Sequence, residues 1–243
     1  MSTSVSRREQ VAAGLSAVRE RIVLACDAAG RDPSEVHLIV VTKTFPADDV
    51  RLLAELGVTD VGENRHQEAV GKHAECADLD LTWHFVGALQ TNKAAAVADY
   101  ADVVHSVDRA RLVRALGRAA EGTGRPLRCL VQVNLDPGEE PARGRSGNRR
   151  SGAHPRQVPA LADELAALGP LELAGVMGVA PPEGDTDAAF AKLAEVGASV
   201  RSRHPGATMV SAGMSGDLEV AVRHGATHVR VGSAVLGERP PNR

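Results

Sequence analysis

A lysine follows a short apolar run near the N-terminus. Residues 37–45 read HLIVVTKTF, so Lys43 stands between two threonines where the run ends. The β-branched run is typical of a buried strand, which would place Lys43 at the strand tip. A desolvated lysine amine readily forms an imine with an aldehyde. The alternative is a lysine whose ammonium group simply extends into solvent.

Two turns rich in glycine and serine lie near the C-terminus and could bind an anion. The sequence SAGMSG contains Ser211, Gly213 and Ser215 just before an expected helix, and VGSAVLG contains Gly232 and Ser233 at the start of another. Free N–H groups and the helix dipole favour negative charge at such positions. One turn of this kind often serves only as a helix cap. Two of them after neighbouring strands indicate a phosphate site.

Arg230 lies in the run HVRVG, where alternation places His228, Arg230 and Gly232 on one face and two valines on the other. If the valines meet outer helices, Arg230 points inward, where a buried guanidinium needs a partner. Two partners are open. One is an acceptor atom of a ligand bound in the barrel. If that atom were the ring nitrogen of a pyridine, an always-charged donor would keep it unprotonated. The other is an internal ion pair with Glu63.

The elements that must position these residues follow from hydrophobic periodicity. Eight short β-branched runs favour strands: 36–42, 58–62, 82–87, 103–107, 128–134, 173–179, 208–212 and 228–232. Alanine- and leucine-rich stretches with helical spacing separate them. This order predicts an α/β fold with a parallel sheet covered by helices, closed as a single (β/α)8 TIM barrel. The alternative, an open doubly wound sheet, would carry GxGxxG where VVTKTFPADD stands.

An extra helix is expected ahead of the barrel. Its apolar positions recur at spacings of four and three: Val11, Leu15, Val18, Ile22 and Cys26. Ser6 and Glu9 can form a capping box at its start, and Gly30 can end it. The whole chain, 1–243, is expected to form one domain. Within it, the segment 136–156 is rich in Gly, Pro, Ser and Arg and predicts a long mobile loop.

Composition narrows the classes of function. The net charge is -3, from 28 basic and 31 acidic residues, which does not suggest a nucleic-acid partner. Three cysteines without CxxC spacing argue against a disulfide framework or a metal site and favour a reducing compartment. The N-terminal sequence MSTSVSRREQ lacks the apolar core of a signal peptide, and no apolar run approaches the ~18 residues of a membrane span. We expect a cytoplasmic protein without a membrane contact.

Closing the barrel would bring the last strand beside the first and Lys43 beside the phosphate site. A phosphorylated aldehyde lying across the barrel mouth would then reach the lysine amine with its carbonyl group. Pyridoxal 5′-phosphate (PLP) satisfies this geometry. A Schiff-base aldolase acting on a sugar phosphate would use the same lysine and the same phosphate site.

Four stretches resemble a known family: VTKT at 41–44, GEN at 62–64, WHFVGALQTNK at 83–93, and SAGMSGDLEVAVRHGATHVRVGSAVLGER at 211–239. Together they resemble the YggS/PROSC family of pyridoxal phosphate homeostasis proteins, from about residue 5 to 239. The resemblance implies a barrel of the alanine racemase N-terminal type with PLP bound as a Schiff base to Lys43. The segment 136–156 is longer and richer in arginine than this family leads us to expect, which affects one side of the pocket mouth.

The resemblance also implies roles for further residues. Arg230 would lie at the ring nitrogen, and Asn64, His84 and Met177 match positions that line the pocket. The phosphate would be held around six residues: Ser211, Gly213, Met214, Ser215, Gly232 and Ser233.

A racemase on this barrel needs a second acid/base opposite the lysine. Alanine racemases bring a tyrosine for this purpose from an added domain and a dimer partner. The only tyrosine here, Tyr100, precedes the fourth strand and should lie at the other end of the barrel, and the chain ends at Arg243. We therefore expect a PLP-binding protein for intracellular storage or delivery of the cofactor, without robust catalysis.

We expect this protein to be a monomer that contacts apo-PLP enzymes only transiently. The alternative is a weak PLP-dependent amino-acid racemase, with His84 or a proton from solvent serving as the second base.

Overall fold

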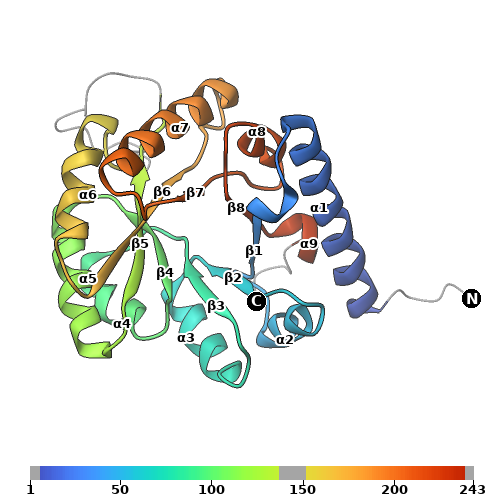
Figure 1. The fold of residues 1–243 in the computed structure, drawn as a ribbon. Coiled ribbons are helices and arrows are strands. Elements are labelled where there is room, and N and C mark those ends of the chain that lie inside the picture. The colour runs from blue at the N-terminus through green and yellow to red at the C-terminus, as the bar shows by residue number, and fades with distance from the viewer. Residues whose placement is uncertain (1–5, 137–151, 239–243) are drawn as a thin grey trace, which may run out of the picture.

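The computed structural model describes residues 6–136 and 152–238, and its centre is a closed barrel of eight parallel strands in chain order (Figure 1). The strands are β1 (His37–Val41), β2 (Asp60–Glu63), β3 (Thr82–Phe85), β4 (Val103–Val107), β5 (Leu127–Val133), β6 (Leu171–Gly178), β7 (Met209–Ser211) and β8 (His228–Val231). β8 pairs with β1, with Val40 opposite Val231, which closes the barrel. The predicted (β/α)8 fold is confirmed.

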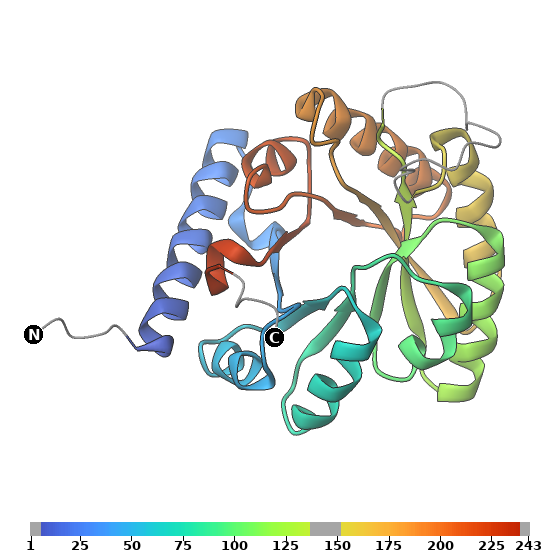
Figure 2. The ribbon, with the colours of Figure 1, turned by 180° about the vertical axis from the view of Figure 1, so that it is seen from behind.

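Helices cover the outside of the barrel; the first helix precedes the first strand, the last helix follows the last strand, and the others lie between consecutive strands (Figures 1 and 2). They are α1 (Arg7–Ala29), α2 (Ala47–Glu55), α3 (His66–Glu75), α4 (Ala94–Ala98), α5 (Ala110–Thr123), α6 (Val158–Ala166), α7 (Thr186–Arg203), α8 (Leu218–Arg223) and α9 (Ser233–Leu236). Short 3-10 turns occupy Pro33–Glu35, Thr91–Lys93 and Pro155–Gln157. None of the helices in these two described ranges is long and apolar enough to cross a membrane.

The extra N-terminal helix, α1, begins and ends where its sequence predicts. The Ser6 hydroxyl accepts from the backbone N–H of Glu9, and the Glu9 carboxylate accepts from the backbone N–H of Ser6 at 2.8 Å. Gly30 ends the helix in a left-handed conformation with φ of 64°. α1 lies along the outside of the barrel against α8 and α9, as both ribbon views show.

The two faces of the strands bury different side chains. Outward-facing valines such as Val229 and Val231 pack into the apolar layer beneath the helices. Inside the barrel, a small apolar cluster includes Val103, Leu130, Ala174, Met177 and Met209. The buried polar residues His84, His105, Ser211 and Arg230 also lie on the strands. Because buried polar groups need hydrogen-bond partners, they must be bonded to one another or to the backbone.

The predicted loop at 136–156 lies mostly outside the described residues. Its described C-terminal end is ordered, because Ala153 bridges to Val133 of β5 and Pro155–Gln157 forms a 3-10 turn. The long mobile loop expected over 136–156 stays a prediction.

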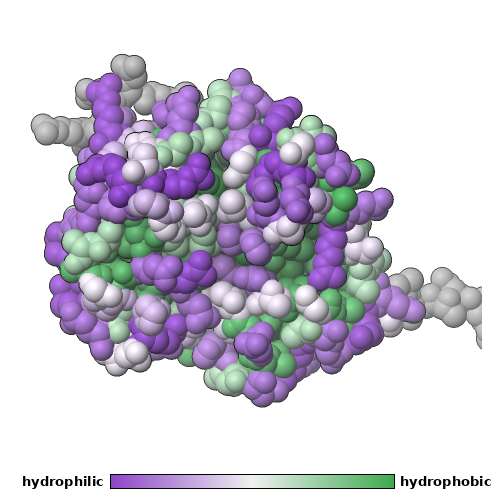
Figure 3. Space-filling model, viewed as in Figure 1, coloured by the Kyte–Doolittle hydropathy of each residue, from purple (hydrophilic) through white to green (hydrophobic). Residues whose placement is uncertain are grey.

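The viewed face of the molecule is mostly hydrophilic, with small apolar patches between the helices (Figure 3). Among the described residues, the exposed large apolar side chains are Val23, Leu24, Val70 and Met214. They come from α1, α3 and the β7–α8 loop, so they do not belong to a single element.

Candidate functional site

A pocket of about 350 Å³ opens at the C-terminal end of the barrel, where Lys43 follows β1. This volume lies within the roughly 300–1,000 Å³ that is usual for small-molecule sites. Its walls come from the ends of several strands: Val41, Lys43, Phe45, Asn64, Val86, Val179, Met214, Ser215, Gly216, Arg230, Gly232, Ser233 and Gly237. An amine, two hydroxyls and a guanidinium therefore share one mostly apolar pocket.

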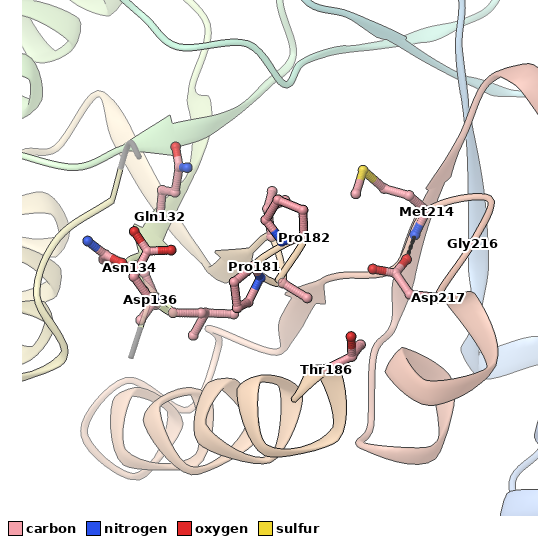
Figure 4. A pocket seen from close by; sticks show the side chains of 13 residues that line it. Gln132, Asn134, Asp136, Pro181, Pro182, Thr186, Met214, Gly216 and Asp217 are labelled. Carbon is pink, nitrogen blue, oxygen red and sulfur yellow. Dashed lines mark hydrogen bonds between the residues drawn. The ribbon is translucent and has the colours of Figure 1, made fainter. Parts of the chain in front are cut away.

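A larger pocket of about 720 Å³ adjoins the first (Figure 4). The two share Val179, Met214 and Gly216 as walls. Its other labelled residues come from the ends of β5 and β6 and from Thr186 and Asp217 at helix starts. It contains no lysine or arginine among its described lining residues, so the amine chemistry belongs to the smaller pocket.

The turn that carries Lys43 is held on both sides by carboxylates. The Thr42 hydroxyl donates to Glu63 Oε1 at 2.5 Å, and the Thr44 backbone N–H donates to Glu68 Oε2 at 2.9 Å. Thr44 has φ of 71°, a conformation that costs free energy for a β-branched residue and needs such support. Lys43 is half-buried between these two anchored threonines. The backbone on both sides of Lys43 is therefore fixed.

Lys72 completes this support from α3. Its Nζ lies 2.6 Å from Glu63 Oε1 and donates to the carbonyl oxygen of Thr42 at 2.7 Å. Glu63 is 1% exposed, and burial raises its pKa, against the lowering effect of the Lys72 charge. Glu63 therefore pairs with Lys72, and the predicted alternative of a Glu63–Arg230 ion pair is wrong. Alternation along β8 shows only which way Arg230 points. It could not show that Glu63 is already paired with a lysine of α3, the helix that follows β2.

The Gly/Ser turns after β7 and β8 come together as predicted. The hydroxyl oxygens of Ser215 and Ser233 lie 3.4 Å apart. Gly213 has φ of +91°, and a Cβ on Gly232 would lie 2.9 Å from the carbonyl oxygen of Val41, so both positions suit glycine. The Met214 backbone N–H donates to Asp217 Oδ1 at 2.6 Å (Figure 4), so it is not free to bind a ligand. Met214 nevertheless lines the pocket.

Helix α1 braces these turns from outside. Arg21 Nη2 donates to the carbonyl oxygen of Ser215 at 3.0 Å while its Nε bonds Glu219 at 2.7 Å. Arg7 Nη1 donates to the carbonyl oxygen of Leu236 in α9 at 2.9 Å. The carbonyls of a helix's last turn, such as that of Leu236 in α9, lack intrahelical partners, and an arginine donor satisfies one of them here. The extra helix thus holds both turns in place.

Arg230 points into the barrel, as alternation predicted. Its Nη1 donates to Ser211 Oγ at 2.6 Å and its Nη2 donates to the carbonyl oxygen of Gly178 at 3.0 Å. Burial lowers its pKa to about 10, so the guanidinium stays charged at neutral pH. Arg230 also lines the pocket and can donate to a group bound there.

Four of the predicted residues do not line this pocket. Ser211 is fully buried, and its hydroxyl bonds Arg230 and His105. Met177 packs in the interior cluster, and Gly213 shapes the turn from behind. His84 is buried, with Nε2 bonded to Asp60 and Nδ1 to His105, so neither ring nitrogen is available as a second base at the pocket. Their roles toward a cofactor remain predictions.

Tyr100 is buried in the helix layer, where it stacks on His66 with ring centres 6.0 Å apart. It does not line the Lys43 pocket. Among the described residues, no cluster of histidine, cysteine, aspartate and glutamate is arranged to hold a metal ion.

Sequence reasoning missed the residues that support the site. Glu68 and Lys72 are spaced i,i+4 on α3, which usually indicates a solvent-exposed pair. Glu68 instead accepts from the backbone N–H of Thr44, and Lys72 donates to the carbonyl oxygen of Thr42, so each contacts the Lys43 turn separately. His105 shares the inward face of β4 with Val103, so alternation could have found it.

Comparison with known proteins agrees with this geometry. The alanine racemase N-terminal domain family matches residues 14–240. A pyridoxal phosphate homeostasis protein of Mycobacterium tuberculosis is 42% identical over 255 aligned residues, which cover 98% of this chain and 96% of the relative. The structure of PipY from Synechococcus elongatus with PLP bound is 35% identical, with a TM-score of 0.79, covering 93% of this chain and 100% of PipY.

Alanine racemase from Corynebacterium glutamicum has the same fold, with a TM-score of 0.64 at 17% identity; the match covers 93% of this chain and 61% of the racemase. The family match spans most of the chain, and the homeostasis relatives are aligned along nearly their whole length. The chain therefore belongs to the alanine racemase N-terminal domain family, within its group of pyridoxal phosphate homeostasis proteins.

Proposed function

We propose that the protein binds PLP as a Schiff base on the ε-amine of Lys43. The observation that carries the proposal is one pocket that joins this amine to the hydroxyls of Ser215 and Ser233 and to the guanidinium of Arg230. A phosphorylated pyridine aldehyde needs these groups, with donors for its phosphate and a partner for its ring nitrogen. PipY, which shares the fold at 35% identity, is known with PLP bound.

The remaining predicted residues take the following proposed roles. Ser233, Ser215 and Gly232 would hold the phosphate, with Gly213 and Met214 shaping the same turn. Asn64 would contact the ring from the end of β2. Ser211, His84 and Met177 would act from beneath the pocket, because their side chains are buried in the barrel interior.

We propose further that the protein stores and delivers PLP in the cytoplasm and does not use it for robust catalysis. A charged Arg230 at the ring nitrogen would keep that nitrogen unprotonated and weaken the ring as an electron sink. His84 has both ring nitrogens engaged, and Tyr100 lies outside the pocket, so neither supports the racemase alternative. Delivery would involve transient contact with apo-PLP enzymes.

An absorption spectrum recorded before and after borohydride reduction tests the cofactor site. We expect an imine band that reduction abolishes, followed by a phosphopyridoxyl adduct on the peptide that contains Lys43. Lys43→Ala should lose the band and the adduct, because no other amine lines the pocket among its described residues. Lys192→Ala, on α7, serves as the matched control. A wild-type protein that stays colourless with added PLP, or an adduct on another lysine, would sink the proposal.

A second experiment separates carrier from enzyme. PLP-loaded protein is mixed with an apo-PLP enzyme, and the return of that enzyme's activity is followed in time. The carrier proposal expects reactivation together with no turnover of D- or L-amino acids by the protein itself. Sustained racemisation that disappears in Lys43→Ala would overturn it in favour of the enzyme alternative.

A further inference from the structure

We infer that Asp60 is a remote positioning residue, which orients the guanidinium of Arg230 through a one-way chain of hydrogen bonds across the barrel interior. Asp60 begins β2 and lies at the end of the barrel opposite the pocket. The inference rests on the proposed function, in which Arg230 meets the ring nitrogen of PLP. It assigns a role to buried polar residues that the binding site itself does not use.

The chain is continuous from one end of the barrel to the other. It comprises His84 Nε2 to Asp60 Oδ1 at 2.9 Å, His84 Nδ1 to His105 Nε2 at 2.8 Å, His105 Nδ1 to Ser211 Oγ at 3.0 Å, and Arg230 Nη1 to Ser211 Oγ at 2.6 Å. All four distances are within hydrogen-bond range, and the Arg230–Ser211 bond is the shortest. The hydrogen-bonded residues lie on β2, β3, β4, β7 and β8. The first three strands are neighbours in the barrel, and the bond from His105 on β4 to Ser211 on β7 crosses the interior.

With neutral imidazoles, the Asp60 end of the chain allows one direction only. An ionised carboxylate accepts and cannot donate, so His84 Nε2 must carry the proton. In a neutral imidazole the other nitrogen is then an acceptor, and His84 Nδ1 accepts from His105 Nε2. By the same logic His105 Nδ1 accepts from the Ser211 hydroxyl.

The Arg230 end is compatible with the same direction. A guanidinium donates and cannot accept, so Ser211 Oγ receives a hydrogen bond from Nη1. The single hydroxyl proton of Ser211 is then free to point to His105. With neutral imidazoles, the Asp60 end therefore specifies one arrangement of protons, in which every donor points toward Asp60, and the Arg230 end fits this arrangement.

Burial favours the neutral form of His105 that this arrangement needs. His105 is fully buried, and burial, followed by the nearby His84, lowers its pKa well below the usual value. Burial alone would raise the pKa of Asp60, but hydrogen bonds from His84 and Thr59 lower it overall. A neutral pair of histidines between a carboxylate and a guanidinium keeps the two charges apart and every polar atom of the chain bonded.

Reversing the chain would disturb Arg230. If both histidines carried the proton on Nδ1, Ser211 Oγ would accept from both His105 Nδ1 and Arg230 Nη1, and its own proton would lose its acceptor in the chain. The guanidinium, held otherwise by the Gly178 carbonyl oxygen, would shift away from Ser211. Asp60 excludes this state because it can only accept.

The first test needs no cofactor, and it uses variants only to assign the signals. Nitrogen-15 NMR of histidine-labelled protein distinguishes the two neutral tautomers and the imidazolium, and His84→Asn and His105→Asn spectra assign the signals. We expect both rings to be neutral with the proton on Nε2. A proton on Nδ1 of either ring, or a charged ring, would overturn the inference.

The second test measures the effect at the cofactor. We expect Asp60→Ala to release PLP about three- to tenfold faster. A change of this size corresponds to the free energy of about one hydrogen bond, here the one from a correctly oriented Arg230. The matched control is Asp163→Ala, which removes a carboxylate that bonds His204 Nε2 at 2.8 Å on the outside of the barrel. The control should leave the release rate unchanged.

A double-mutant cycle separates positioning from a general loss of stability. Ser211→Ala cuts the chain beside Arg230, so Asp60→Ala should add nothing in that background. Additive effects would mean that Asp60 acts elsewhere and would refute the inference. If wild-type protein binds no PLP at all, the proposed function fails, and the tautomer spectra of the unloaded protein still decide whether the chain exists.

Discussion

Lys72 and Glu63 form a buried ion pair beneath the turn that carries Lys43, and the two charges depend on each other. Removing one partner of such a pair leaves an uncompensated charge in the interior, which costs more than the pair contributes. Burial already raises the pKa of Glu63 while Lys72 opposes the shift. Without Lys72 the pKa of Glu63 would rise further.

We expect Lys72→Met to lower the free energy of unfolding by about 3–5 kcal/mol at pH 8. A carboxyl group whose folded-state pKa is raised contributes its stability below the unfolded-state pKa and loses it as pH rises through the folded-state pKa. The loss should therefore be smaller at pH 5, where Glu63 can be protonated. Urea unfolding at the two pH values measures both quantities.

Arg114→Met is the control for this comparison, because Arg114 pairs with Glu164 at 2.6 Å on the surface. It should cost less than about 1 kcal/mol at either pH. A Lys72→Met effect as small as that of the control, or one that is the same at both pH values, would contradict the interpretation.

At the scale of elements, α1 acts as a brace on the phosphate end of the pocket. Gly14 permits close contact between α1 and α9, because a Cβ there would lie 2.5 Å from the carbonyl oxygen of Val235. Ser233 begins α9 and lines the pocket. A displacement of α9 would therefore move one of the two serine hydroxyls.

Gly14→Ala is expected to weaken PLP binding by roughly tenfold, the value of one hydrogen bond to a charged group. Binding of pyridoxal, which lacks the phosphate, should change much less. Gly71→Ala is the matched control, since Gly71 lies in the exposed middle of α3 with nothing within 4 Å of the added Cβ. It should leave both affinities unchanged and stabilise the protein by about 0.5–1 kcal/mol. Equal losses for PLP and pyridoxal in Gly14→Ala would show that α9 does not act through the phosphate.

At the scale of the whole molecule, the exposed large apolar side chains of the described residues are distributed over separate elements. Stable dimers usually bury a continuous surface with an apolar core. We expect a monomer of 25.4 kDa in solution. Light scattering coupled to size-exclusion chromatography measures the mass directly, and a species of twice this mass at micromolar concentration would refute the expectation.

The fold could be predicted from the sequence because its signals are local. Apolar periodicity marked all eight strands, and the Ser6–Glu9 capping box marked the start of α1. Alternation along β8 was enough to turn Arg230 inward, since side chains of a strand alternate strictly between its two faces. The positions of Lys43, Ser215 and Ser233 at one pocket follow from closure of the barrel.

The partners of the buried polar residues were decided only by tertiary structure. Ser211 bonds Arg230 and His105 in the interior, and the sequence alone did not indicate these two partners. Glu63 forms its ion pair with Lys72, whereas one interpretation of the sequence paired it with Arg230. β4 also shifts register between Val104 and Val107, which alternation cannot reveal. A strand pattern specifies which face a side chain takes, but the group that it meets across the barrel depends on register, and register is set by the packing of the whole sheet.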